Sequence, residues 1–284
     1  MKFDNYMGKF ASSGDVQTAV DNGDLVKPYV ALVEDGNYID WNTKKPNPKY
    51  RYLTFELLED CSVRFNSQEG DMEVKINDGE WGTDFSIGVS KPYNKGTKFE
   101  FRKNGTGCKN FFNIFGKFKT YGNIMSLISK ENFLNITTVG DKAFERFFAG
   151  STGLTDASEL ILPATTLSNN CYSNMFQDCT SLTTAPELPA TTLGQNCYKG
   201  MFTRCTSLIT APELPATTLV NACYQQMFQN CSNLNYIKCL ATSLTGTYGW
   251  VNGVASTGTF IKAAGVSWST GISGIPDGWT VQEV

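Results

Sequence analysis

Apolar side chains recur in the second half of the chain with a period of 26 residues. Residues 180–205 and 206–231 are two copies of one unit, and residues 153–179 carry the same pattern with two extra residues before Pro163. The repeated apolar positions are Leu182, Leu188, Leu193, Cys197, Met201, Phe202 and Cys205, which match Leu208, Leu214, Leu219, Cys223, Met227, Phe228 and Cys231. A unit this short cannot bury these side chains by itself, whereas stacked units bury them as continuous ladders.

Prolines divide each unit into two parts. Pro186 and Pro189 in one copy, and Pro212 and Pro215 in the next, fix corners and exclude a helix through those positions. The C-Y-x-x-M-F string that follows is compatible with a short helical or 3-10 segment, so each unit is expected to hold a strand, a corner and such a segment. The period lies within the roughly 20–29 residues of leucine-rich repeats. We therefore predict a solenoid of leucine-rich-type repeats, preceded by a decayed copy at 143–154.

Residues 49–122 show the two-residue alternation of β-strands instead. The alternating runs are 50–57, 61–66, 72–77, 80–87 and 97–102. Asn77-Asp78-Gly79 marks a hairpin turn between two of them, and Asn104-Gly105 marks another tight turn. Five or six short strands at this spacing predict a small antiparallel β-sandwich.

The two ends of the chain complete the predicted organisation. Ser12-Ser13-Gly14-Asp15 begins one short capped helix that ends at Gly23, and two short strands flank Asp35-Gly36, in a segment too small to fold alone. Strands at 257–263 and 278–284 are expected to cover the end of the solenoid. The predicted fold is mainly β, with an anchor or assembly segment (1–48), a small antiparallel β-sandwich (49–122), a leucine-rich-repeat solenoid (123–244) and a β C-terminal cap (245–284).

Charge is unevenly distributed, and the small net charge gives no support to two classes of partner. Lys, Arg, Asp and Glu are concentrated in residues 1–149, while the repeats are rich in Thr, Ser, Asn and Gln. The net charge of −3 is too small to indicate a nucleic-acid partner or an anionic membrane. No apolar run reaches the ~18 residues that span a bilayer, and residues 1–17 contain no signal-peptide pattern. We therefore expect no membrane span and no export by a signal peptide.

Cysteine and histidine usage limits the chemistry. The chain has no histidine, which removes the commonest general base and metal ligand. Six of its nine cysteines repeat at the same period, as Cys171, Cys197 and Cys223 and as Cys179, Cys205 and Cys231. Within a unit the two cysteines are eight residues apart, which is not the spacing of a zinc site. We expect reduced structural ladders, no metal site, no catalytic residues and no cofactor.

Two groups of charged residues are candidate sites. Glu59-Asp60, and Asp71 with Glu73, are the nearest paired carboxylates, but they flank predicted turns and are interpreted as solvated loop charges. A basic cluster could attract phosphate or an acidic glycan, although a surface patch without function is favoured because acidic residues lie between its members. This cluster contains Lys91, Lys95, Lys98, Arg102 and Lys103.

The candidate binding residues lie in the repeats. Tyr172, Tyr198 and Tyr224 recur in register, so they form either a platform for sugars or a partner, or a partly buried ladder with hydroxyls at the surface. Positions that differ between matching units indicate exposure, because the core constrains the rest. The candidates chosen on this basis are Gln195, Lys199, Arg204, Gln225 and Gln229.

Several long strings resemble a known family. LPATTL…CY..MF..C..L, YGNIMSLI (121–128) and CSNLNYIKCLATSL…GIPDGWTVQ resemble the BspA-like leucine-rich repeats of Bacteroides and related gut bacteria. That resemblance implies a surface-exposed recognition protein, of a kind often regarded as adhesins. FASSGDVQTAVDNGDLVKPYVALVEDGNYIDWN (10–42) is similar to segments at the start of structural proteins of Bacteroides phages, including crAss-like ones. It implies that residues 1–48 anchor the chain to other virion proteins.

Together these observations predict a non-catalytic phage virion protein of the fibre or decoration type. We expect it to reside in the virion, to bind a host-surface glycan or protein, and to form a homotrimer that multiplies weak contacts. One alternative is a bacterial cell-surface adhesin without its leader. A second is a carboxylate-based glycosidase.

Overall fold

The structure, a computed structural model, describes strand segments 9–10, 30–33, 38–40 and 45–46, and residues 51–67, 70–83 and 86–284. Its first sheet contains β1 (Lys9–Phe10), β2 (Val30–Val33), β3 (Tyr38–Asp40) and β4 (Lys45–Pro46) in that order, with β1 and β2 parallel. The helix predicted from Ser12 to Gly23 lies outside the described residues.

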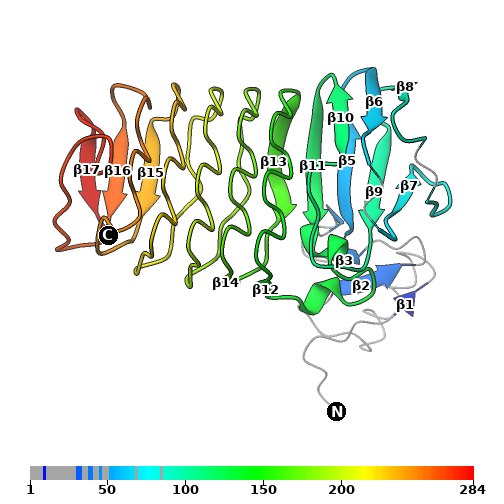
Figure 1. The fold of residues 1–284 in the computed structure, drawn as a ribbon, viewed down its shortest axis with the longest axis horizontal. Helices are drawn as coiled ribbons and strands as arrows, with labels where there is room; N and C mark the ends of the chain where they lie inside the picture. Colours follow the sequence, from blue (N-terminus) through cyan, green and yellow to red (C-terminus); the bar gives the residue numbers. More distant parts are fainter. Residues whose placement is uncertain are drawn as a thin grey trace, which may run out of the picture.

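Two sheets follow (Figure 1). A three-stranded antiparallel sheet has the order β10-β6-β8, and a five-stranded sheet has the order β13-β11-β5-β9-β7. Their strands are β5 (Leu53–Leu57), β6 (Cys61–Phe65), β7 (Glu73–Ile76), β8 (Ser90–Tyr93), β9 (Lys98–Arg102), β10 (Phe112–Phe115), β11 (Phe118–Asn123) and β13 (Leu154–Ile161). Aromatic rings pack between the two sheets. The ring centroids of Phe55 (β5) and Phe112 (β10) are 4.5 Å apart, and those of Phe65 (β6) and Phe99 (β9) are 5.9 Å apart.

The sequence located some of these strands and missed others. The runs at 50–57, 61–66, 72–77 and 97–102 contain β5, β6, β7 and β9, and the turn at Asn77 is closed by a bond from the Gly79 N–H to the Ile76 carbonyl of 3.0 Å. The run at 80–87 contains no strand in its described part. Strands β8, β10 and β11 were not predicted, and β11 pairs in parallel with β13 across the predicted boundary at residue 122.

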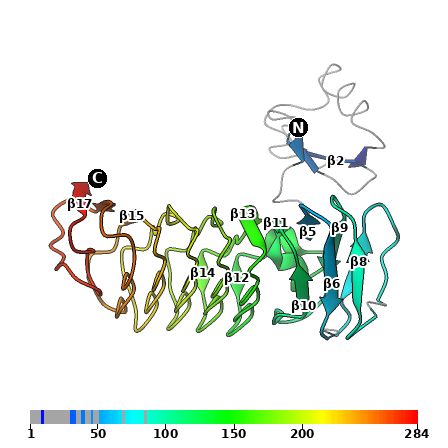
Figure 2. The same ribbon diagram turned by 90° about the horizontal axis from the view of Figure 1, so that it is seen from above.

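Beyond β13 the repeat units lie side by side (Figures 1 and 2). Backbone bonds join them along residues 169–179, 195–205 and 221–231, which we call the turn wall. The Tyr172 N–H donates to the Cys197 carbonyl at 3.0 Å, and the Tyr198 N–H donates to the Cys223 carbonyl at 3.1 Å. Alternate N–H groups along the wall donate in this way to the following unit, and those between them close turns within their own unit. Nearly every amide of the wall is therefore used.

A left-handed residue recurs at every fourth position of the turn wall. Its positions are Asn170, Asn174 and Asp178, then Asn196, Gly200 and Arg204, then Ala222, Gln226 and Asn230, all with φ between 54° and 62°. Each such residue turns the chain out of the extended conformation. The wall is consequently a succession of tight turns, where a short helical segment was predicted.

The predicted architecture of a sandwich followed by a leucine-rich-repeat solenoid with a β cap is wrong, although the chain is mainly β. Strands in the described residues form separate small sheets, and no sheet runs through the repeats. Apart from β13, which pairs with β11, the paired strands there are β12 (Thr138–Val139) and β14 (Thr166–Leu167), with isolated bridges such as Thr166 to Thr192. Left-handed residues interrupt extended backbone on the turn wall, and the corner prolines lack the N–H that a parallel ladder needs.

The repeated apolar residues are buried as predicted. Phe176, Phe202 and Phe228 stack with centroids 5.4 and 5.7 Å apart. All nine cysteines are buried, and none of them forms a disulfide. The thiol of Cys205 donates to the Phe176 carbonyl at 3.1 Å, and that of Cys231 donates to the Phe202 carbonyl at 3.0 Å. Each thiol thus satisfies a carbonyl of the preceding unit.

The chain ends in a parallel three-stranded sheet at the far end of the molecule (Figure 1). It contains β15 (Tyr236–Cys239), β16 (Thr259–Lys262) and β17 (Thr280–Glu283). The last two lie within the strands predicted at 257–263 and 278–284. Two 3-10 segments, η2 (Ile124–Leu127) and η3 (Phe133–Asn135), precede the repeats.

We expect Gln226→Gly to stabilise the protein by about 0.5–1 kcal/mol. Gln226 is held at φ 56°, a conformation that costs a residue with a Cβ about 1–2 kcal/mol. Glycine avoids this cost, but it loses more conformational entropy on folding, which offsets part of the gain in stability. The matching position in the preceding unit is already Gly200, at φ 60°. Urea unfolding of the two proteins measures the difference. Gly200→Ala is the opposite control and should be destabilising, because its Cβ would lie 2.3 Å from Asn174 Oδ1.

Candidate functional site

The three tyrosines do not form a surface platform. Tyr172, Tyr198 and Tyr224 are buried, and their rings stack 6.0 and 6.2 Å apart. The column continues to Phe144 on one side and Trp250 on the other. Burial raises the pKa of all three phenols well above the ordinary value. The Tyr172 hydroxyl has no hydrogen-bond partner among the described residues. These rings are core residues and are inaccessible to a ligand.

The predicted polar residues lie on the turn wall. Gln195 and Arg204 are exposed, while Lys199, Gln225 and Gln229 are half-buried. Arg204 donates from Nε and Nη2 to the two carboxylate oxygens of Asp178 in the preceding unit. This hydrogen-bonded pair lowers the pKa of Asp178. The structure therefore gives Arg204 a partner within the chain.

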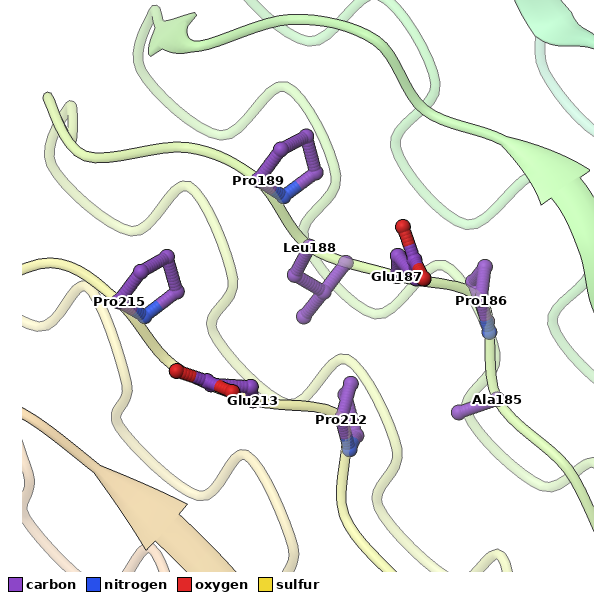
Figure 3. Close-up of a pocket in the computed structure, with 8 residues that line it drawn as sticks. All are labelled: Ala185, Pro186, Glu187, Leu188, Pro189, Pro212, Glu213 and Pro215. Carbon is purple, nitrogen blue, oxygen red and sulfur yellow. The ribbon is translucent and has the colours of Figure 1, made fainter. Parts of the chain in front are cut away.

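A groove lies on the proline corners. It has a volume of about 410 Å³ and is lined by residues 185–189 of one unit and by Pro212, Glu213 and Pro215 of the next. Figure 3 shows that in each unit the glutamate lies between the two prolines. Leu188 forms part of the floor and is buried, whereas Glu187, Pro189 and Glu213 are exposed.

The groove extends toward the start of the repeats. A second depression of about 200 Å³ is lined by residues 158–163 together with Glu187 and Pro189, which also line the first. Glu159 and Pro163 occupy in this unit the places of Glu187 and Pro189. We call the combined surface of 158–163, 185–189 and 212–215 the corner groove. It presents one carboxylate and a proline ring from each of three successive units.

The corner groove contains the signal that sequence reasoning missed. The string APELPATTL is identical in the two best copies, and identity between copies by itself predicts core positions. Yet Glu187, Thr191 and Thr192 are exposed, as are their counterparts Glu213, Thr217 and Thr218. Exposed residues of the turn wall differ between the same copies. A position that is both exposed and repeated without change is not explained by packing.

The groove offers apolar contact and hydrogen-bond acceptors. Proline rings and Leu188 supply the apolar surface, and the glutamates supply carboxylate oxygens. Glu213 forms an ion pair of 3.0 Å with Lys238 of β15, which orients its carboxylate. The Glu213 side chain remains half exposed in this pair. The carboxylates of Glu159 and Glu187 have no ion-pair partner among the described residues. They are free to accept hydrogen bonds from hydroxyl or amide groups.

The paired carboxylates considered from the sequence hold the fold together. Glu59 accepts from the Lys117 N–H at 2.9 Å, and Asp60 accepts from the Lys95 N–H at 2.8 Å. Hydrogen bonds from Lys130, and then from Arg102, lower the pKa of Glu73. These oxygens are therefore occupied by structural partners.

Nowhere in the described residues do three or more Cys, Asp or Glu side chains gather closely enough to hold a metal ion. Among the helices of that same part of the chain, none has the length and apolar character to cross a bilayer. No protein-family model, curated protein or solved structure matches the chain.

Proposed function

We propose that the protein is a non-catalytic recognition protein that binds an extended glycan of a host surface along the corner groove. The observation that carries the proposal is the repetition of exposed Glu and Thr residues, beside recurring prolines, in units whose exposed turn-wall residues differ. Repetition of the same contacts in successive units suits a ligand that is itself repetitive.

The spacing of the units supports a polysaccharide as that ligand. Stacked rings of successive units lie 5.4–6.2 Å apart, which is close to the length of one hexose in an extended chain. Sugars offer hydroxyl donors to carboxylates and apolar C–H faces to rings. A groove of alternating proline rings and glutamates provides both kinds of contact at each step.

We further propose that the chain acts as a structural component of a phage particle and presents the groove to the host. Support comes from the resemblance of residues 10–42 to the start of Bacteroides phage structural proteins. Attachment of several copies to one particle would multiply weak contacts at each groove.

Glu187→Gln combined with Glu213→Gln should weaken glycan binding at least tenfold. Hydrogen bonds to a charged acceptor contribute about 1.5–3 kcal/mol each, and a loss of about 1.4 kcal/mol is already tenfold in affinity. The measurement is binding of the full chain to a glycan array, followed by titration calorimetry with the best ligand. Glu131→Gln is the matched control, because Glu131 is exposed and distant in sequence from the groove.

If the double variant keeps its glycan affinity, or if the Glu131 control loses affinity equally, the glycan does not bind in the corner groove. Release of shortened sugars from the bound ligand would favour a glycosidase instead. Mass spectrometry of purified phage particles and of host outer membrane tests the location. Recovery only from outer membrane of cells without phage genes would identify a bacterial adhesin.

A further inference from the structure

A second hollow lies far along the chain from the corner groove. It has a volume of about 580 Å³, and its lining is predominantly polar. Four cationic side chains contribute to it, from Arg51, Lys75, Lys95 and Lys98, against the two carboxylates of Asp78 and Glu100. We call this hollow the basic pocket.

Strand pairing explains why these residues converge. Lys75 of β7 lies opposite Glu100 of β9, and Lys98 begins β9 directly after the turn that contains Lys95. The backbone of both lysines is fixed: the Lys98 N–H donates to Asn77 Oδ1 at 2.8 Å, and the Lys95 N–H donates to Asp60 Oδ1 at 2.8 Å. The pocket is therefore framed by two anchored turns and the strands between them.

The charges of the pocket are incompletely balanced. Lys75 forms an ion pair of 3.2 Å with Glu100, and the Arg51 guanidinium lies 4.5 Å from the centre of the Tyr121 ring. Within the described residues, neither Lys95 nor Lys98 has an ion-pair partner. Among the residues that line the pocket, Asp78 is the only carboxylate outside the Lys75–Glu100 pair. The lining itself therefore carries an excess of positive charge on a concave surface, where the field is focused.

Not every member of the basic cluster expected from the sequence takes part. Arg102 is paired with Glu73, and the Lys91 ammonium donates to Ser86 Oγ at 2.6 Å. Lys103 is buried. The structure replaces these three with Arg51 and Lys75, which lie far from the cluster in sequence.

We propose that the basic pocket binds a compact oxyanion, a carboxylate or a phosphate, carried by a sugar. Its volume lies within the roughly 300–1,000 Å³ of small-molecule sites. Lys95 and Lys98 supply ammonium donors to the oxyanion. The Asn77 amide is held by its oxygen, which leaves its N–H groups available to sugar hydroxyls. This site is independent of the corner groove and of its proposed ligand.

Isothermal titration calorimetry of the full chain at low salt tests the proposal with three probes: glucuronate, glucose 6-phosphate and glucose. We expect at least one charged probe to bind at least tenfold more tightly than glucose, with affinity that falls as salt is added. Lys95→Gln combined with Lys98→Gln should abolish that preference. Lys109→Gln, which removes an exposed charge elsewhere, should preserve it, as should the Glu187/Glu213 double variant of the corner groove.

The identity of the tighter probe distinguishes a carboxylate ligand from a phosphate ligand, and either result supports the site. Equal affinity for all three probes, or no binding of any, would overturn it. So would an unchanged preference in the Lys95/Lys98 double variant. Thermal unfolding of that variant near the wild-type temperature shows that a lost preference is not a loss of fold.

Discussion

Phe202→Ala is expected to destabilise the protein by about 3–5 kcal/mol, as truncation of a fully buried aromatic side chain does elsewhere. Phe202 is inaccessible to solvent and lies between Phe176 and Phe228, with interplanar angles of 3° and 6°. Its neighbours are fixed by backbone bonds between units, so they cannot move together to fill the space. Urea unfolding followed by circular dichroism measures the loss.

Ile209→Ala is the matched control within the same unit. The Ile209 side chain is 53% exposed, so its truncation should change the free energy of unfolding by less than about 0.5 kcal/mol. A loss below about 1 kcal/mol for Phe202→Ala would show that the ring column is not the core of the repeats.

Alkaline unfolding is the second large effect that we expect. Thiols of the unfolded chain ionise near their ordinary pKa of 9.0, whereas burial raises the pKa of Cys171, Cys231 and Cys239 to about 12. Between these values the folded state keeps protons that the unfolded state has lost. Stability is therefore complete below pH 9 and falls as the pH rises toward 12.

The slope of this loss can be stated. Each such thiol removes about 1.4 kcal/mol of stability per pH unit in that window, so three thiols remove about 4 kcal/mol per unit. Burial also raises the pKa of Cys179, Cys197, Cys205 and Cys223, which steepens the loss. A domain stable by about 5–15 kcal/mol should unfold between about pH 10 and 11.

Urea unfolding at a series of pH values measures the slope. Cys171→Ala combined with Cys231→Ala should reduce it by about 2.8 kcal/mol per pH unit, whatever these changes do to stability at neutral pH. A slope that is the same in both proteins, or a stability that is constant from pH 8 to 11, would contradict the burial of the thiols.

The sequence predicted the core of the repeats better than their backbone. The 26-residue register placed Phe202, Cys205 and Met201 correctly, because burial of matched residues depends only on the stacking of equal units. It did not reveal the turn wall, although six of the nine left-handed positions hold Asn, Asp or Gly, which adopt this conformation readily. The other three, Arg204, Ala222 and Gln226, rarely adopt it, and the pattern is therefore incomplete in any single unit.

Candidate sites were harder to predict for a related reason. Difference between copies identified Gln195 and Arg204 as exposed, but it directed attention away from Glu187 and Glu213, which are identical and also exposed. Because a glutamate between two prolines is an unusual core residue, its repetition is the sequence signal that indicates an exposed, functional position. The basic pocket required the pairing of β7 with β9, which brings Lys75 to Lys98 and which no local pattern contains.

The hydrogen bonds of the turn wall all point one way. In the backbone-to-backbone bonds of the wall, each unit donates N–H groups to its successor and accepts on its carbonyl groups from its predecessor, so the two flanks of the wall are unlike and can be joined in a single order. A tandem duplication of 26 residues always restores that order, whereas two like flanks would bring donors against donors. Gain or loss of whole units can thus lengthen or shorten the corner groove by fixed steps, and the length of the groove becomes a heritable quantity that changes without any new core.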